Sequence, residues 1–364
     1  MLNQIRKIIE KIKGEDIFCS VKDEEFILKV LEKKKKKITP FNFKQTDKKG
    51  IELLEFVLSL TKEAIILYNK NIPKNKKKKI FFFFVDDMEI NAFATIIKNI
   101  DVIGINVGIL NTLYDYYDKV VDENIFPEVG SDVEERKNLI FRLQVMSILY
   151  IICHELGHLY NGHIGFNKVN FMKEIRKFNG REKIIYNKTI EMDADAFAMN
   201  RMLEFNENLI GVKSKDLNKT YNYDSIEYSY KILMFSMYSF YLFFQETFEA
   251  SDIENDTYFS PVVRQLLNLT ISEEFVNRTR PQFESKIKEI TDYLMMHADF
   301  TLDRYYSNEK SDEEKAKYLI KKLQYFQSNE LKEEMLEVKK EWNEIRDELQ
   351  KNARFNLAPK YELK

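Results

Sequence analysis

Two kinds of hydrophobic spacing divide the chain. Apolar residues recur at three- and four-residue intervals through residues 1–75 and again from residue 220 onward, which predicts helices packed on one apolar face. Between these segments, compact apolar runs at residues 80–85, 90–96 and 102–107 have the length of strands. The pattern therefore predicts an α+β, mainly helical fold in which a small sheet lies among helices.

The order of these segments predicts three consecutive regions. We expect a helical region at residues 1–75, a core that contains the sheet at residues 76–215, and a second helical region packed on that core at residues 216–364. Within the core, the apolar residues Val145–Ile152 predict a buried helix. Asp132 is a suitable N-cap for this helix, because its carboxylate can accept the first unpaired backbone N–H groups.

Composition and charge exclude several classes of protein. Lys and Arg number 57 and Asp and Glu 59, so the net charge of −2 gives no general attraction for nucleic acid. The lysine runs Lys33–Lys37 and Lys76–Lys79 lack the interleaved aromatic residues of a nucleic-acid-binding surface. The longest uncharged apolar run, Ile232–Phe244, has 13 residues, whereas a membrane-spanning helix needs about 20. Two cysteines are too few for a disulfide framework, and the N-terminal residues do not resemble a signal peptide. We therefore expect a cytoplasmic protein without a transmembrane anchor and without a nucleic-acid partner.

Three of the four histidines lie within ten residues, and two of them belong to an H-E-x-x-H motif. On a helix, His154 and His158 lie one turn apart on the same face, so both imidazoles can bind one metal ion. Glu155 then stands beside the metal as a general base. The alternative is a chance occurrence on a surface helix, which the apolar residues before the motif argue against. The motif predicts the helix of a zinc hydrolase.

A zinc site of this kind needs a third protein ligand and leaves a fourth position open. Glu191 is the candidate, because Glu191 and Asp195 are four residues apart and share one face of a predicted helix. The small residues Ala194 and Ala198 would permit close packing of that helix. Glu191 would bind the metal, and Asp195 would accept the outer ring N–H of a ligand histidine and fix its orientation. The alternative is an acidic first turn whose carboxylates only complement the helix dipole.

The other two histidines fit the metal site less well. Some zinc peptidases take a third histidine from H-E-x-x-H-x-x-G-x-x-H, but here His163 comes one residue early. If the helix simply continued, His163 would lie about half a turn from His154 and point away from the metal face, which predicts a structural role or a place at the rim. We expect His297 to be a partly buried helix residue, with stabilisation of a developing oxyanion as the alternative.

Four segments of the chain form a recognisable series: Ile90–Ala94, Val102–Leu110, His154–His163 and Glu191–Ala198. In this order they resemble the core of gluzincin metallopeptidases of the HtpX and CAAX-prenyl-protease type, over about residues 80–205. The resemblance implies a zincin-like catalytic core in which the two motif histidines and Glu191 bind zinc. It also implies a base at Glu155 and a supporting carboxylate at Asp195.

Two features depart from that family. Its members are commonly anchored by transmembrane helices, which this chain is not expected to have. The family often has a His-Pro pair followed by an arginine, whereas here Ser260 and Pro261 are followed closely by Arg264. Tyr258, Arg264 and His297 are the candidates for contacting the substrate or the oxyanion. In having the motif without an anchor, the chain is similar to the phage-exclusion protease Lit and to ImmA/IrrE-type regulators, which act on particular cytoplasmic proteins.

Two further segments have predicted roles. The strand at Asn91, Ala92, Phe93 and Ala94 would bind an extended peptide through main-chain hydrogen bonds and set the scissile carbonyl against the metal, with an ordinary sheet strand as the equal alternative. Residues 164–190 would form either a lid or a substrate-selecting insert.

The motifs together predict a zinc-dependent endopeptidase of gluzincin type, with Zn²⁺ as cofactor and a specific intracellular protein or peptide as substrate. The alternative is a non-proteolytic regulatory or defence sensor that retains zinc in a latent site. Glu155 argues against the alternative, because a structural zinc site has no use for a base and usually has four protein ligands.

Overall fold

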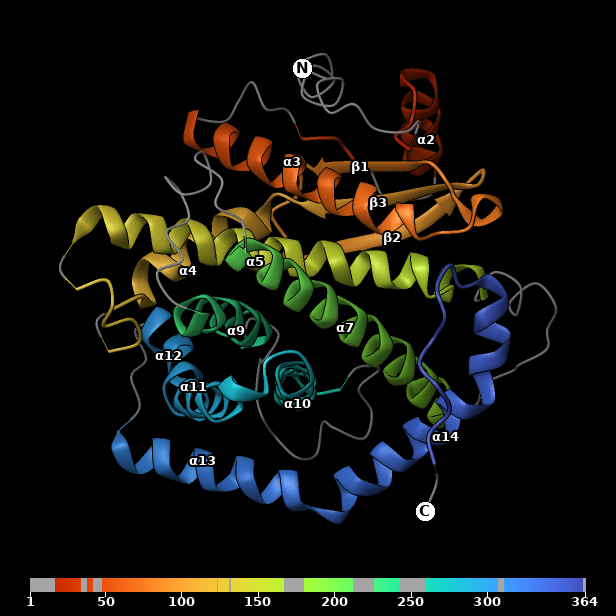
Figure 1. Cartoon of the computed structure of the whole chain (residues 1–364). Helices are drawn as coiled ribbons and strands as arrows, with labels where there is room; N and C mark the ends of the chain where they lie inside the picture. Colours follow the sequence, from red (N-terminus) through yellow and green to blue (C-terminus); the bar gives the residue numbers. More distant parts are fainter. Residues whose placement is uncertain are drawn as a thin grey trace. The chain divides into compact units, whose positions relative to one another are not determined.

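The computed structural model describes residues 17–33, 38–41, 48–122, 124–130, 132–166, 180–211, 226–242, 259–306 and 311–362 (Figure 1). Within these residues the chain is mostly helical and contains one small sheet, which confirms the predicted α+β, mainly helical class. The elements are α2 (Val21–Lys33), α3 (Lys48–Lys70), β1 (Ile80–Val85), β2 (Ala92–Ile97), β3 (Ile100–Asn106), α4 (Gly108–Val120), α5 (Val133–Tyr160), α7 (Gly180–Gly211), α9 (Ile226–Leu242), α10 (Pro261–Thr279), α11 (Glu284–His297), α12 (Thr301–Tyr305), α13 (Asp312–Gln327) and α14 (Asn329–Asn352).

The three predicted strands form one mixed sheet in the order β1-β3-β2. The first strand pairs in parallel with the third, with Ile80 opposite Asp101, and the second pairs with it antiparallel. Lys98 and Asn99 form the two-residue turn between β2 and β3, and both have positive φ angles of 46° and 64°. This backbone conformation matches the right-handed twist of the two strands that the turn connects.

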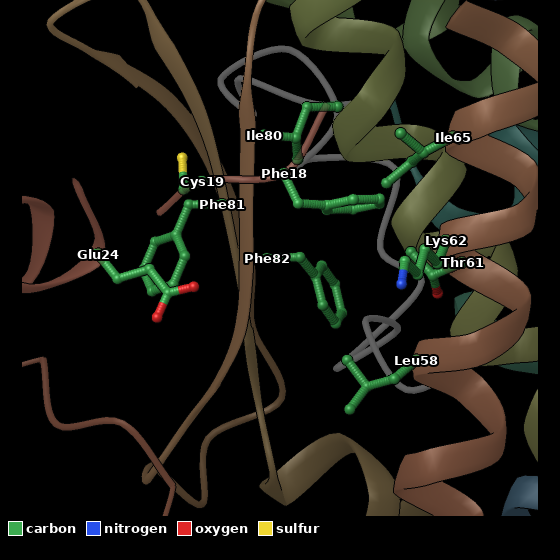
Figure 2. A pocket seen from close by; sticks show the side chains of 10 residues that line it. All are labelled: Phe18, Cys19, Glu24, Leu58, Thr61, Lys62, Ile65, Ile80, Phe81 and Phe82. Carbon is green, nitrogen blue, oxygen red and sulfur yellow. The ribbon is translucent and has the colours of Figure 1, made fainter. Parts of the chain in front are cut away.

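The side chains of β1 alternate between the two faces of the sheet, as expected for a strand with helices on both sides. Phe81 and Phe83 belong to a buried cluster with Ile27 of α2. Phe82 lies on the opposite face, where α3 runs across the sheet and Leu58 lines the same pocket (Figure 1, Figure 2). The uninterrupted apolar run of β1 is therefore explained by burial on both faces.

Contacts within the chain divide it into two compact units, and the expected division into three regions stays a prediction. The first unit comprises Met1–Thr112, His154–Ile175 and Glu348–Ala358, and the second comprises Leu113–Cys153, Arg176–Asp347 and Pro359–Lys364. The sheet, α2 and α3 belong to the first unit. The second unit is built from helices and has its own buried core, in which α9 is buried along most of its length.

Helix α5 is long, apolar and capped as expected. The backbone N–H groups of Glu134 and Glu135 donate to the Asp132 carboxylate at 2.8 and 3.1 Å, which confirms Asp132 as the N-cap. Of the helices described, α5 is the one whose length and composition would allow it to cross a membrane. Its most apolar 18-residue window is 89% buried inside the protein, and the core helix of a soluble protein meets the same criterion.

Candidate metal centre

The motif histidines face each other from successive turns of α5. The Nε2 atoms of His154 and His158 lie 3.1 Å apart, and the two ring planes are inclined by 82°. Residues four apart on a helix share a face, so this approach follows directly from the H-x-x-x-H spacing. Both side chains are half-buried.

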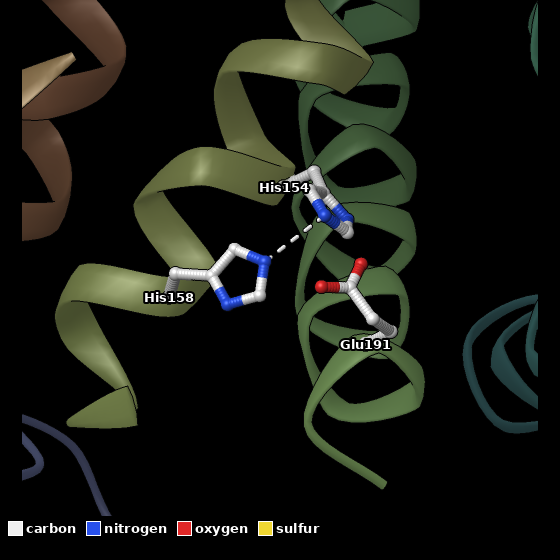
Figure 3. A group of neighbouring side chains, drawn as sticks. All are labelled: His154, His158 and Glu191. Atoms are coloured by element: carbon white, nitrogen blue, oxygen red, sulfur yellow. Dashed lines mark hydrogen bonds between the residues drawn. The ribbon is translucent and has the colours of Figure 1, made fainter. Parts of the chain in front are cut away.

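Glu191, on α7, completes a three-residue group with the two histidines. One possible ligand atom from each of His154, His158 and Glu191 lies within 4.8 Å of the other two. In Figure 3 both imidazoles and the Glu191 carboxylate are turned toward one another. Among the residues that the structure describes, this is the one group of three or more His, Cys, Asp or Glu side chains that could hold a metal ion.

The donor set fits zinc. Two imidazole nitrogens and one carboxylate are a ligand set that catalytic zinc sites use, with Zn–N distances near 2.0 Å. Two nitrogens bound to one tetrahedral zinc ion lie about 3.3 Å apart. The observed 3.1 Å between the two Nε2 atoms is close to this spacing. Three protein ligands would leave one position open, as catalysis requires.

Glu155 lies between the two motif histidines in sequence and is 8% exposed. It belongs to the same turn of α5 as His154. A carboxylate at this position of the motif is the group that can accept a proton next to a metal.

Arg264 of α10 binds the second carboxylate on the α7 face. Its Nε and Nη2 atoms donate to the two oxygens of Asp195 at 2.6 and 2.7 Å, which makes a bidentate ion pair. The same Nη2 atom lies 3.7 Å from Oε2 of Glu191. Burial opposes the charged form of Arg264, but Asp195 outweighs it and holds the pKa of the guanidinium well above its ordinary value. One fixed positive charge therefore faces both carboxylates.

A buried group of hydroxyls and an amide surrounds the same carboxylate. The Tyr150 hydroxyl donates to Asp195 at 3.2 Å and is hydrogen-bonded to the Tyr241 hydroxyl. The Asn268 amide donates to both hydroxyls at 2.9 Å. Burial, together with the nearby Asp195 charge, raises the pKa of Tyr150 well above its usual value, so its hydroxyl keeps its proton. The predicted contact of Asp195 with a ligand histidine stays a prediction.

The sequence interpretation missed the position of His163. Its Nδ1 atom lies 3.0 Å from Nδ1 of His158, and its side chain is fully buried. The expected half-turn displacement assumed a continuous helix, but α5 ends at Tyr160. The available signal was Gly162, because a glycine shortly after a helix commonly reverses the chain.

A comparison with known families gives the class of the protein. The family model of peptidase U49 matches residues 54–270, which is more than half of the chain. The chain belongs to the peptidase U49 family. The match includes both motif histidines, Glu191 and Arg264. No curated protein and no solved structure was found to match.

The remaining predicted site residues of this U49 peptidase lie on other elements or outside the described residues. Asn91 precedes edge strand β2, which contains Ala92, Phe93 and Ala94 and pairs with β3 on one side. His297 ends α11 and is exposed rather than partly buried, with its ring 4.3 Å from the Tyr293 ring. Tyr258 lies outside the described residues. So do residues 167–179 of the predicted lid or insert, whereas the segment from residue 180 onward is part of α7.

Proposed function

We propose that this U49 peptidase is a zinc-dependent endopeptidase in which His154, His158 and Glu191 hold the metal. The observation that carries the proposal is the convergence of these three side chains, with ligand atoms within 4.8 Å of one another. The membership of a peptidase family supports a hydrolytic role for the group rather than a structural one.

The roles of the side chains follow from their chemistry. A zinc ion bound there would polarise the scissile carbonyl and lower the pKa of a water molecule. Glu155 would accept a proton from that water and deliver it to the leaving amine. Asp195 and Arg264 would hold α7 so that Glu191 keeps its direction, since the arginine contacts both carboxylates.

We further propose that the substrate is a specific intracellular protein, met in the cytoplasm. Strand β2 is at the edge of the sheet, and an edge strand can pair with an extended peptide through main-chain hydrogen bonds. The candidate segment Asn91–Ala94 would select an unfolded or extended stretch of that substrate. The near-neutral net charge of −2 gives no reason to expect nucleic acid as a partner.

The test combines metal content with proteolysis. Zinc per chain is measured in purified wild type, Glu191→Ala and Glu155→Gln, and cleaved peptides are compared across a cell lysate treated with each. We expect one zinc per wild-type chain, its loss in Glu191→Ala, and full zinc in Glu155→Gln. Cleavage should fall by about 10²–10⁴-fold in Glu155→Gln, because the general base is lost while the metal stays.

A matched control separates the site from general effects of substitution. Glu182→Ala removes an exposed carboxylate from the same helix. This variant should retain zinc and activity. Full zinc in Glu191→Ala would refute the third ligand, and unchanged cleavage by Glu155→Gln would refute the mechanism. Zinc without any cleavage by wild type would favour the sensor alternative.

A further inference from the structure

The chain reverses directly after the metal-binding turn of α5. The backbone N–H of Asn161 still donates to Gly157, but Gly162 has a φ of +87° in the left-handed region. A new helical turn then begins at His163. In this turn the backbone N–H of Phe166 donates to the carbonyl of Gly162. His163 therefore belongs to a second turn that folds back, and its position is not set by the period of α5.

This reversal brings His163 next to Nδ1 of His158, on the ring edge opposite the one that faces His154. The two Nδ1 atoms of His158 and His163 lie 3.0 Å apart, and the ring centroids lie 5.1 Å apart at an interplanar angle of 72°. On its other side, His158 directs Nε2 toward His154. The imidazole of His158 is thus held at both nitrogens, and its two nitrogens face different partners.

With a metal ion bound at His158, this contact would determine which ring atoms carry protons. A metal ligand at Nε2 of His158 must offer a lone pair there, so the ring proton of neutral His158 resides on Nδ1. That N–H can donate only if Nδ1 of His163 is unprotonated, which places the proton of neutral His163 on Nε2. We propose that His163 is a positioning residue that accepts the Nδ1–H of His158 and thereby presents its Nε2 lone pair to the metal. The inference rests on the proposed zinc site.

The C-terminal segment holds this arrangement in place. The backbone N–H of Arg354 donates to the carbonyl of Tyr160 at 2.7 Å, at the last residue of α5. A Cβ atom on Gly162 would lie 2.8 Å from backbone atoms of Asn352 and Ala353, so the reversal is packed directly against that segment. Arg354 is itself anchored by a fully buried ion pair with Asp101 of β3. The direction of His163 therefore depends on residues almost 200 positions later in the chain.

Three substitutions at His163 distinguish its role as a hydrogen-bond acceptor from a role as a ring that only fills space. In asparagine the amide oxygen is bonded to Cγ, as Nδ1 is in histidine, so His163→Asn can still accept from His158. In glutamine the oxygen is one bond further out, near the position of Nε2, so His163→Gln has the same chemistry in the wrong place. His163→Phe keeps a ring and removes the acceptor.

The experiment is a zinc competition titration of the full chain against a chromophoric chelator. We expect His163→Asn to bind zinc within about threefold of wild type, and His163→Gln and His163→Phe to bind about 10–100-fold more weakly. Thermal unfolding of each metal-free variant reports any loss of structure. In ¹⁵N-labelled zinc-loaded protein, the Nδ1–H signal of His158 should persist in wild type and His163→Asn.

The outcomes distinguish this inference from the proposed function. If wild type binds no zinc, or if His158→Ala binds it as tightly as wild type, the proposed metal site fails. If His158→Ala loses zinc but all three His163 variants bind it normally, only the positioning role of His163 fails. Equal loss of affinity in the asparagine and glutamine variants would also overturn it, because a purely structural role does not depend on where the acceptor lies.

Discussion

The two supports around the candidate metal centre use different chemistry. On the histidine side, His158 is contacted by the buried ring of His163, whose direction depends on a backbone reversal. On the carboxylate side, the bidentate ion pair of Asp195 with Arg264 connects α7 to α10. We call the contact between the His158 and His163 rings the geometric support, and the ion pair between Asp195 and Arg264 the charged support.

The difference follows from the chemistry of the candidate ligands. A histidine ligand is neutral, and its outer nitrogen needs only a hydrogen-bond acceptor. Glu191 and Asp195 are two carboxylates one helical turn apart, and like charges at this spacing repel each other. A nearby guanidinium removes the repulsion, and its planar fork also fixes the orientation of Asp195. We therefore expect loss of the charged support to destabilise the fold more than loss of the geometric one.

Arg264→Met should have the largest effect on stability. It would leave the Asp195 side chain, 5% exposed, without its charged partner, and breaking a buried pair from one side costs about 3–5 kcal/mol. The free energy of unfolding in urea is the measurement. The stability of Arg264→Lys should fall between those of wild type and Arg264→Met. Lysine restores the positive charge but cannot make the bidentate hydrogen bonds of the planar guanidinium.

A double variant sharpens this prediction. Asp195→Leu combined with Arg264→Met removes both charges, so its loss of stability should be much smaller than the sum of the two single losses. If the losses simply add, the ion pair is not the reason that α7 and α10 depend on each other, and the contrast between the two supports disappears.

Gly162→Ala should have a smaller effect on stability than Arg264→Met, and should weaken zinc binding as well. The residue has a left-handed backbone, and the new Cβ would meet the backbone of residues 352–353, so we expect a loss of about 1–3 kcal/mol. Urea unfolding and the zinc competition titration are the two readouts.

The matched control for this variant is Gly165→Ala, three residues along the same short turn. There the nearest atom to an added Cβ is the side-chain Oδ1 of Asn352 at 3.1 Å, and φ is not in the left-handed region. Gly165→Ala should change stability by less than about 1 kcal/mol. Equal losses at the two glycines would show that the reversed backbone at Gly162 has no special role.

Tyr150→Phe should have the smallest effect. It removes the hydroxyl that donates to Asp195, while Arg264 still holds both oxygens of that carboxylate. The Asn268 amide and the Tyr241 hydroxyl, which also bond to the Tyr150 hydroxyl, still bond to each other in the variant. We therefore expect a loss of only about 1 kcal/mol in the free energy of unfolding. A loss above about 3 kcal/mol would mean that the tyrosine, and not the arginine, is the main support of Asp195.

Short-range patterns in the sequence determined much of the fold. The apolar runs at 80–85, 90–96 and 102–107 became three strands with ends within two residues of those predicted. Asp132 caps α5, and the long helices at both ends of the described chain agree with the apolar periodicity. These features depend on neighbours within a few positions, so spacing alone predicts them.

The sequence also determined the candidate ligands, because His154 and His158 share a helix face whatever surrounds them. The assignment of zinc, of Glu191 as third ligand and of Glu155 as base remains a proposal. The tertiary structure decided which groups support that site. It paired Asp195 with Arg264 and brought His163 to His158 through a reversal that a segment near residue 353 holds in place. Such contacts depend on a left-handed backbone and on residues far apart in the chain, and no local period records either of them.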